Sequence, residues 1–63
     1  MSEFNAEDWL RLTPAQRVAQ CRRMAEEARG LSKESSGDLA QAYTELARNW
    51  DNLAEEIERT IPR

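Results

Sequence analysis

The feature that most constrains this chain is a set of large hydrophobic residues that repeat at helical spacing in its second half. Consecutive members are 4, 3, 4, 3 and 4 residues apart, which is the heptad rhythm of a helix that packs lengthwise against another helix. A strand would instead need an alternation of period two. The six residues are Leu39, Tyr43, Leu46, Trp50, Leu53 and Ile57. This stripe predicts a long helix over about residues 37–60, which Pro62 ends.

Small residues follow the stripe along one flank. Ala40, Ala47 and Ala54 recur every seven residues, and Ile61 continues their row. Small side chains at a fixed flank allow a neighbouring helix to approach closely. The preceding segment carries a complementary set of small residues, namely Cys21, Ala25 and Ala28. The two segments are therefore predicted to form an antiparallel helical hairpin.

Capping residues place the start of the first long helix. Thr13 is a good N-cap, Pro14 suits the first helical position, and Gln16 completes a capping box. A long helix is therefore expected to begin at Pro14.

Gly30 makes the end of that helix harder to place. It could act as a C-cap after Arg29, but the apolar spacing continues through it to Leu31. An interior glycine costs about 1 kcal/mol relative to alanine, which tertiary packing can offset. We expect the helix to run over about residues 14–34, with Ser36 as the N-cap of the next helix.

A third, shorter helix is predicted near the N-terminus. Asn5 is a good N-cap, and Phe4 and Trp9 have the spacing of a hydrophobic staple around it. We expect this helix over about residues 6–11. The whole chain, residues 1–63, is then a single all-α domain.

Composition narrows the class of protein. The 63 residues include 9 Lys and Arg against 12 Asp and Glu, giving a net charge of −3, which disfavours nucleic acid as a partner. No apolar run approaches the roughly 20 residues that a membrane-spanning helix needs. The N-terminus is acidic where a signal peptide would be basic. We expect a cytoplasmic protein with neither nucleic acid nor membrane as partner.

Charge also differs between the two long helices. Residues 11–34 hold six basic and three acidic side chains, whereas residues 38–63 hold three basic and six acidic ones. The expected pairing brings one flank of each helix together, and such pairs disfavour wrong registers. The basic flank comprises Arg22, Arg29 and Lys33, and the acidic flank comprises Asp38, Glu45 and Glu56.

No combination of residues in the chain points to catalysis. Histidine is absent, so neither a Ser–His or Cys–His pair nor the Glu-x-x-His motif of di-iron bundles can be assembled. Cys21 lies in the small-residue stripe, where a packed thiol is favoured over a redox thiol. Tyr43 has the position of a core aromatic. We expect no enzyme, no cofactor and no metal site.

A lone hairpin would leave Trp50 half exposed, because two helices share only one interface. Chains below about 70–80 residues rarely obtain more than about 3–5 kcal/mol from a single core, and small chains commonly associate. We expect two hairpins to meet as a homodimeric four-helix bundle. The alternative is a monomer in which the N-terminal helix folds back as a third layer. The predicted oligomer interface comprises Tyr43, Leu46, Trp50, Leu53 and Ile57.

Two segments carry a resemblance to a known group of proteins. "CRRMAEEAR" (residues 21–29), followed after a turn by "AYTELARNWDNLAEEIE" (residues 42–58), resembles the short helical-hairpin proteins of rhizobia and other alphaproteobacteria. The resemblance covers about residues 19–58 and departs from the group's pattern at Gly30. It implies a bacterial origin and a helical hairpin, and it implies no chemistry.

Two classes of function remain open from the sequence. The first is a non-enzymatic homo-oligomer that serves as a structural or protein-interaction module and could dock onto a larger protein partner. The second is a small-ligand-binding or regulatory module, with a pocket between hairpins near Trp50 and Tyr43.

Overall fold

The chain folds into three helices that follow one another closely. The computed structural model describes residues 6–62, of which 89% are helical, and no strand occurs in that range. The helices are α1 (Ala6–Arg11), α2 (Pro14–Glu34) and α3 (Gly37–Thr60). The all-α class that the sequence predicts is confirmed.

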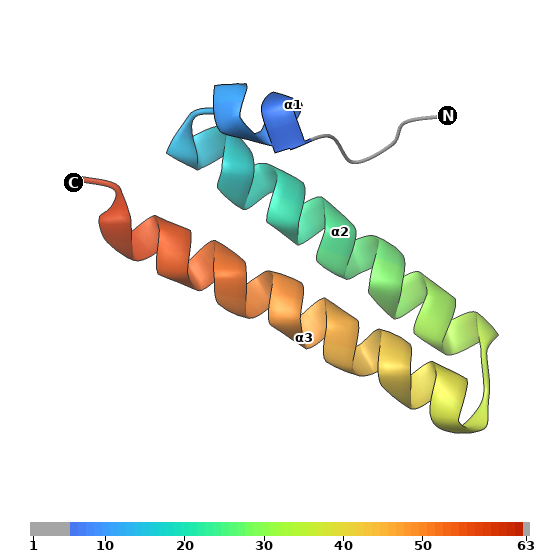
Figure 1. Ribbon diagram of the computed structural model, residues 1–63. Coiled ribbons are helices and arrows are strands. Elements are labelled where there is room, and N and C mark those ends of the chain that lie inside the picture. The colour runs from blue at the N-terminus through green and yellow to red at the C-terminus, as the bar shows by residue number, and fades with distance from the viewer. Residues whose placement is uncertain (1–5, 63) are drawn as a thin grey trace.

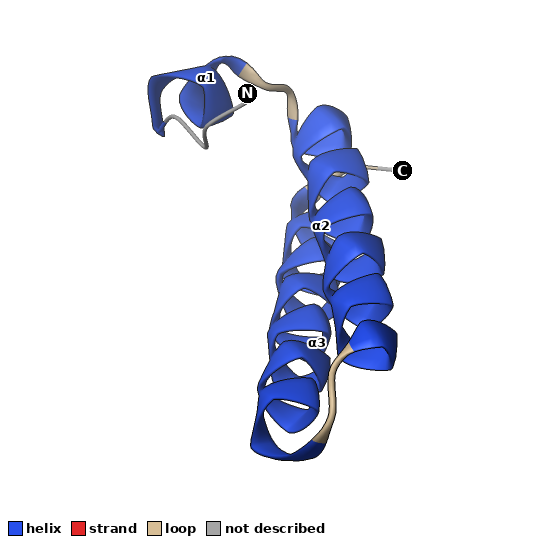
Figure 2. Ribbon diagram, turned by 90° about the vertical axis from the view of Figure 1, so that its right-hand side faces the viewer, coloured by secondary structure: helices blue, strands red, loops and turns tan. Residues whose placement is uncertain are grey.

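Helices α2 and α3 lie side by side and antiparallel, as a long hairpin (Figure 1). Helix α1 is attached at the end of the hairpin opposite the turn, and it stands away from the hairpin axis (Figure 2). It is therefore an arm of the molecule and does not form a third layer over the length of the hairpin. The expected Asn5 cap and the Phe4 side of the staple lie outside the described residues.

The start of α2 is fixed by the capping box that the sequence predicts. Thr13 Oγ1 accepts a hydrogen bond from the Gln16 amide at 3.1 Å, and Gln16 Oε1 accepts one from the Thr13 amide at 2.8 Å. Two amide groups at the helix start are thereby satisfied. The helix then continues through Gly30 to Glu34, as the apolar spacing predicts.

A tight turn joins the two long helices. The Ser35 amide donates to the Ser32 carbonyl at 3.2 Å, which closes the last turn of α2. Ser36 takes the N-cap position of α3 as expected, but its side chain makes no capping hydrogen bond. Gly37 follows with φ 63°, a left-handed conformation that favours glycine.

The hairpin core consists almost entirely of small side chains. We call this contact line the seam; its buried members, each at most 3% exposed, are Cys21, Ala25, Ala28, Ala47 and Ala54. Trp50 is half-buried and packs against the alanine cluster within it. Tyr43 and Ile57 are also half-buried. Small side chains allow the two helices to lie close together along this line.

The six large residues that the sequence predicts as one stripe fall into two groups in the structure, one half-buried and one exposed. Tyr43, Trp50 and Ile57 contribute to the seam, whereas Leu39, Leu46 and Leu53 are exposed beside it. The row of alanines, and not the full stripe of six, is the line along which α3 meets α2. No helix within residues 6–62 combines the length and hydropathy needed to cross a membrane.

Candidate functional site

The hairpin has two broad faces, which helix geometry assigns by position relative to the seam. Successive residues are about 100° apart around a helix, so the neighbours before and after a seam residue point to opposite flanks. Five hydrophobic residues lie on one flank of the seam, and we call their side the apolar face. Met24, Leu46 and Leu53 each precede a buried seam residue, and Leu31 and Leu39 lie on the same flank nearer the turn. Four charged residues each follow a seam position, and we call their side the polar face: Arg22, Arg29, Asp51 and Glu58.

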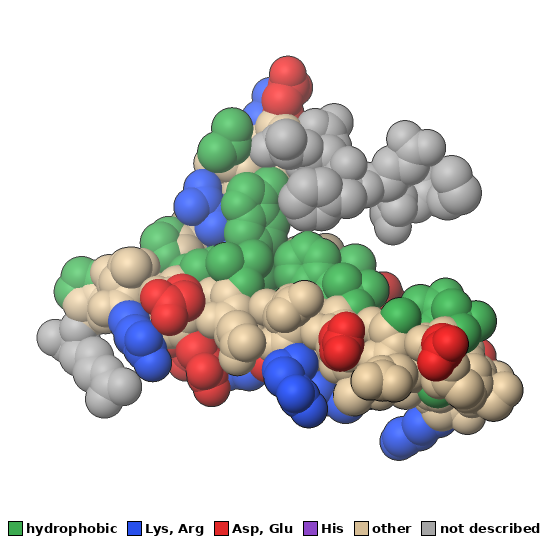
Figure 3. Space-filling view, turned by 60° about the horizontal axis from the view of Figure 1, so that its bottom comes forward, with side chains coloured by type: hydrophobic (Ala, Val, Ile, Leu, Met, Phe, Trp, Pro, Cys, Tyr) green, Lys and Arg blue, Asp and Glu red, His purple; other side chains and the backbone are tan. Residues whose placement is uncertain are grey.

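The apolar face leaves leucine side chains in contact with solvent. Leu31, Leu46 and Leu53 are 43%, 43% and 40% exposed, and Leu39 at the turn end is 57% exposed. Figure 3 shows hydrophobic side chains gathered along the side of the hairpin from which α1 projects. Since isolated exposed leucines are common but an aligned set is not, this face is the candidate interaction surface.

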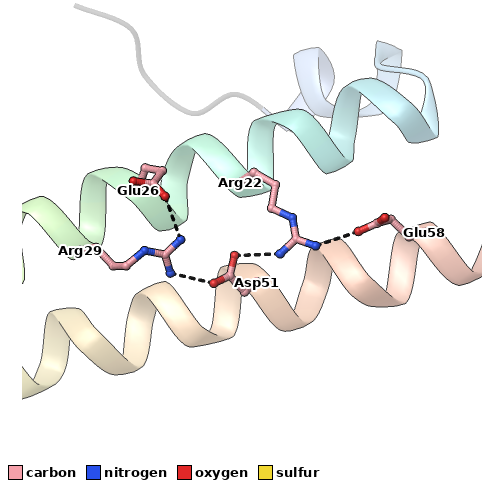
Figure 4. A network of polar contacts seen from close by, with 5 residues as sticks. All are labelled: Arg22, Glu26, Arg29, Asp51 and Glu58. Atoms are coloured by element: carbon pink, nitrogen blue, oxygen red, sulfur yellow. Dashed lines mark hydrogen bonds and ion pairs between the residues drawn. The ribbon is translucent and has the colours of Figure 1, made fainter.

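The polar face is closed by an ion-pair network between the two helices (Figure 4). Asp51 lies between two arginines of α2: Arg22 Nη1 is 3.0 Å from Oδ1, and Arg29 Nη1 is 2.8 Å from Oδ2. Arg22 also reaches Glu58 Oε1 at 2.8 Å, and Arg29 reaches Glu26 Oε1 at 3.1 Å. These bonds fix the register of α3 against α2.

The network changes the pKa values of Asp51, Arg22 and Arg29. Hydrogen bonds from Arg29 and then from Arg22 hold the pKa of the Asp51 carboxyl below its ordinary value. The hydrogen bonds to Asp51 in turn raise the pKa of both arginines. The contacts of Asp51 with the two arginines therefore stay charged over the whole physiological range of pH.

Hydroxyl groups continue the polar face toward the turn. Ser32 Oγ and Thr44 Oγ1 are 2.7 Å apart. They lie 2.8 Å and 3.0 Å from the Ala40 carbonyl oxygen, to which each can donate. The two hydroxyl groups therefore find their hydrogen-bond partners within the hairpin.

The prediction of acidic partners for the basic flank was wrong. Arg22 and Arg29 do face α3, but they bind Asp51 and Glu58 in place of the predicted acidic flank of Asp38, Glu45 and Glu56. The alanine row sets the rotation of α3 about its axis. That rotation directs the residues after Trp50 and Ile57 toward the arginines. Lys33, expected on the same flank, forms no ion pair within residues 6–62.

The residues predicted for an oligomer interface lie partly in the seam and partly beside it. Leu46 and Leu53 belong to the apolar face, and Tyr43, Trp50 and Ile57 are half-buried beneath or beside it. All five therefore lie on or near one continuous stretch of α3. A pocket near Trp50 and Tyr43 between two hairpins stays a prediction, since it would need a second chain.

Cys21 is fully buried in the seam. Burial raises the pKa of its thiol, and the nearby Arg22 charge offsets this in part. The side chain is packed, as expected for a cysteine in a stripe of small residues.

An open hollow of about 380 Å³ adjoins the apolar face on the outer side of α2. It is lined by Glu27, Gly30, Leu31 and Glu34. The sequence reasoning did not identify this feature. The sequence feature that could have indicated it is a pair of glutamates seven residues apart with a glycine between them. The glycine leaves open the space that a side chain would otherwise occupy.

Helix α1 is held at its base by Arg17. The Arg17 guanidinium donates from Nε to the Trp9 carbonyl at 3.1 Å and from Nη2 to the Leu10 carbonyl at 3.2 Å. It also lies over the Trp9 ring, 5.7 Å from its centroid. These contacts fix the direction of the arm. Leu10 on that arm is 70% exposed.

Comparisons of the chain with protein-family models, with curated proteins and with solved structures give no match. The resemblance to alphaproteobacterial hairpin proteins therefore stays a prediction. Within the described part of the chain, no group of three or more His, Cys, Asp or Glu residues is arranged to hold a metal ion.

Proposed function

We propose that this protein is a non-enzymatic, homo-oligomeric helical module that acts through protein–protein contacts, with the apolar face as the subunit interface. Two hairpins that meet through this face form a four-helix bundle. A single observation carries the proposal. The small alanines are buried in the core, whereas the larger, aligned leucines are exposed to solvent.

The energetics of a chain this small support association. The fully buried side chains of the hairpin are four alanines and one cysteine, which remove little apolar area from water. A second hairpin over the apolar face would bury the leucines and the exposed side of Trp50. Fold and assembly would then be stabilised by the same contacts.

The dimensions of the apolar face also suit a dimer. Helix α3 has 24 residues, which makes the face about 36 Å long, and two helices side by side are about 20 Å wide. The product, about 700 Å², is close to the roughly 800 Å² per partner of a standard stable interface.

Charge substitution on the apolar face tests the proposal. Leu46→Glu combined with Leu53→Glu would place two carboxylates in the proposed interface, and we expect sedimentation velocity to show a monomer. The matched control is Gln41→Glu combined with Asn52→Glu, which adds the same charges at exposed α3 positions away from this face. A wild-type chain that sediments as a monomer at every concentration would refute the proposal.

A further inference from the structure

We infer that two copies of this chain dock with their turns at opposite ends, so that the α1 arm of each copy covers the hollow beside Gly30 of the other. The inference rests on the proposed homodimer and adds the direction of packing and the role of α1. It explains three features that a face-to-face dimer alone leaves unused: the arm, the hollow and the two carboxylates on its rim.

The arm has the side chains for such a contact. Leu10 is the most exposed large hydrophobic residue of the described chain, at 70%. Arg11, in the last turn of the arm, is exposed and positively charged, and Arg17 of α2 lies against the arm. The two acidic residues of α1, Glu7 and Asp8, lie in its first turn, whereas Arg11 lies in its last turn, next to α2 along the chain. The base of the arm is therefore apolar and basic.

The hollow has the complementary chemistry. Leu31 gives it an apolar wall, and Glu27 and Glu34 give it negative charge. Neither carboxylate forms an ion pair with any residue between 6 and 62, although both are exposed on a hairpin rich in arginine. A Cβ atom added to Gly30 would meet nothing within 4 Å, so the space above the helix is open to an incoming side chain.

One chain cannot bring its own arm to its own hollow. The arm is attached at Pro14 and the hollow is centred on Gly30, so they are separated by about 24 Å of helix. Arm and hollow therefore lie near opposite ends of α2. Only a second chain can connect them.

The direction of packing follows from this separation. When the turns point in opposite directions, each arm reaches the hollow of the other copy, and a two-fold axis repeats the contact. The axis then crosses the apolar face near the middle of the hairpin, close to Trp50 and Leu53. With the turns at the same end, both arms would meet one another and both hollows would stay empty.

The arm also has a suitable length. Six helical residues extend about 9 Å, and packed helices lie about 8–10 Å apart. Because α1 projects from the apolar side (Figure 3), it spans the depth of one helix layer of the docked copy.

Disulfide trapping tests the direction of packing. In a Cys21→Ala background, Leu10→Cys and Leu31→Cys place one thiol on the arm and one beside the hollow, both at exposed positions. We expect mild oxidation to convert this variant into a covalent dimer. The control replaces Leu31→Cys with Gln41→Cys, an exposed position of α3 on the other side of the hairpin, and should remain uncross-linked.

The outcomes separate this inference from the proposed homodimer. A dimer in sedimentation that does not cross-link through Leu10→Cys and Leu31→Cys would overturn arm docking and leave the homodimer intact. Cross-linking of Leu10→Cys alone would indicate arms that meet at one end, which also overturns it. A wild-type chain that sediments as a monomer would overturn both arm docking and the proposed homodimer.

Neutralising the rim provides a second test. Glu27→Gln combined with Glu34→Gln removes the negative charge that faces the arm in both halves of the dimer. We expect the dissociation constant to rise about tenfold at low salt, as four weak surface ion pairs would allow. Glu45→Gln combined with Glu55→Gln changes the net charge equally at exposed α3 positions. Equal dissociation constants for the two double variants would contradict a contact between arm and rim.

Discussion

The two faces of the hairpin are built on the same seam, but they differ in what they leave for a partner. On the polar face Arg22, Arg29, Asp51 and Glu58 satisfy one another across the two helices. On the apolar face Leu39, Leu46 and Leu53 extend beside the alanines without a second layer to cover them. One face is complete within a single chain and the other is not.

This difference shows that, in a short chain, the contacts that set helix register need not be those that provide most of the stability. The ion pairs of the polar face are partly exposed, so water screens them and each adds little free energy, but together they fix how α3 is aligned with α2. The apolar face offers hydrophobic area, which is the larger energy, but two helices alone cannot bury it. The polar face thus sets the register of the two helices. The apolar face would add to the free energy of folding when a second copy buries it.

The largest expected effect is at Trp50, where the seam meets the apolar face. Trp50→Ala should lower the free energy of unfolding by about 3–5 kcal/mol, because the indole packs on the alanine cluster and would also be covered by a second hairpin. Circular dichroism and sedimentation at micromolar concentration should show a largely unfolded monomer. A folded variant with an unchanged melting temperature would mean that the apolar face contributes no more than the polar face.

The seam itself should respond less. Cys21→Ala should lower the free energy of unfolding by about 1 kcal/mol, since the lost thiol leaves only a small cavity between the helices. Denaturant unfolding measures the change, and the oligomeric state should be unaffected. In the wild type, the buried thiol should react slowly with a labelling reagent, and rapid labelling of the native protein would contradict the packed position.

A substitution at Gly30, beside the apolar face, measures the effect of helix propensity on stability. Gly30→Ala should raise the free energy of unfolding by about 0.5–1 kcal/mol, because the helix continues through this position and the added methyl meets no neighbouring atom. The wild type and the variant should be compared by denaturant unfolding at one fixed protein concentration. A destabilised variant would indicate a helix that is interrupted in solution.

The smallest effect belongs to the polar face and depends on pH. The pKa of Asp51 is lowered in the folded chain, so its contribution is present above its ordinary value of 3.8 and is lost as pH falls through the lower folded value. Asp51→Asn should cost about 1 kcal/mol or less at pH 6, because its partners are partly exposed, and a smaller amount at pH 2, toward which the carboxyl increasingly binds a proton. Urea denaturation at both pH values measures this. An equal cost at both would show that the carboxylate charge is not what matters.

The sequence predicted the helices well because their ends are encoded locally. The Thr13 and Gln16 capping box, the break at Ser35 and Ser36 and the terminal Pro62 act within a few residues of the boundaries they set. The row of alanines on α3 and the small residues of α2 likewise identified the surfaces that pack together.

The rotation of α3 about its axis could not be read as reliably. Its leucines and its alanines both repeat every seven residues on neighbouring flanks, so two contact lines were compatible with the heptad pattern. Only the packed hairpin shows that the alanines face α2 while the leucines flank them. The pairing of Arg22 and Arg29 with Asp51 depends on that rotation and was therefore missed. The hollow beside Gly30 was missed because it arises from space and not from a residue type.

The turn at Ser35–Ser36 has a consequence for the speed of folding. Because it joins the helices directly, the seam forms between residues that are brought together by closing one short loop, and low contact order of this kind gives folding in microseconds to milliseconds. Formation of the proposed homodimer would be second-order, at a rate set by protein concentration. If the proposed homodimer forms, refolding monitored by tryptophan fluorescence should therefore separate into a fast phase that is independent of concentration and a slower phase that accelerates as the protein is concentrated.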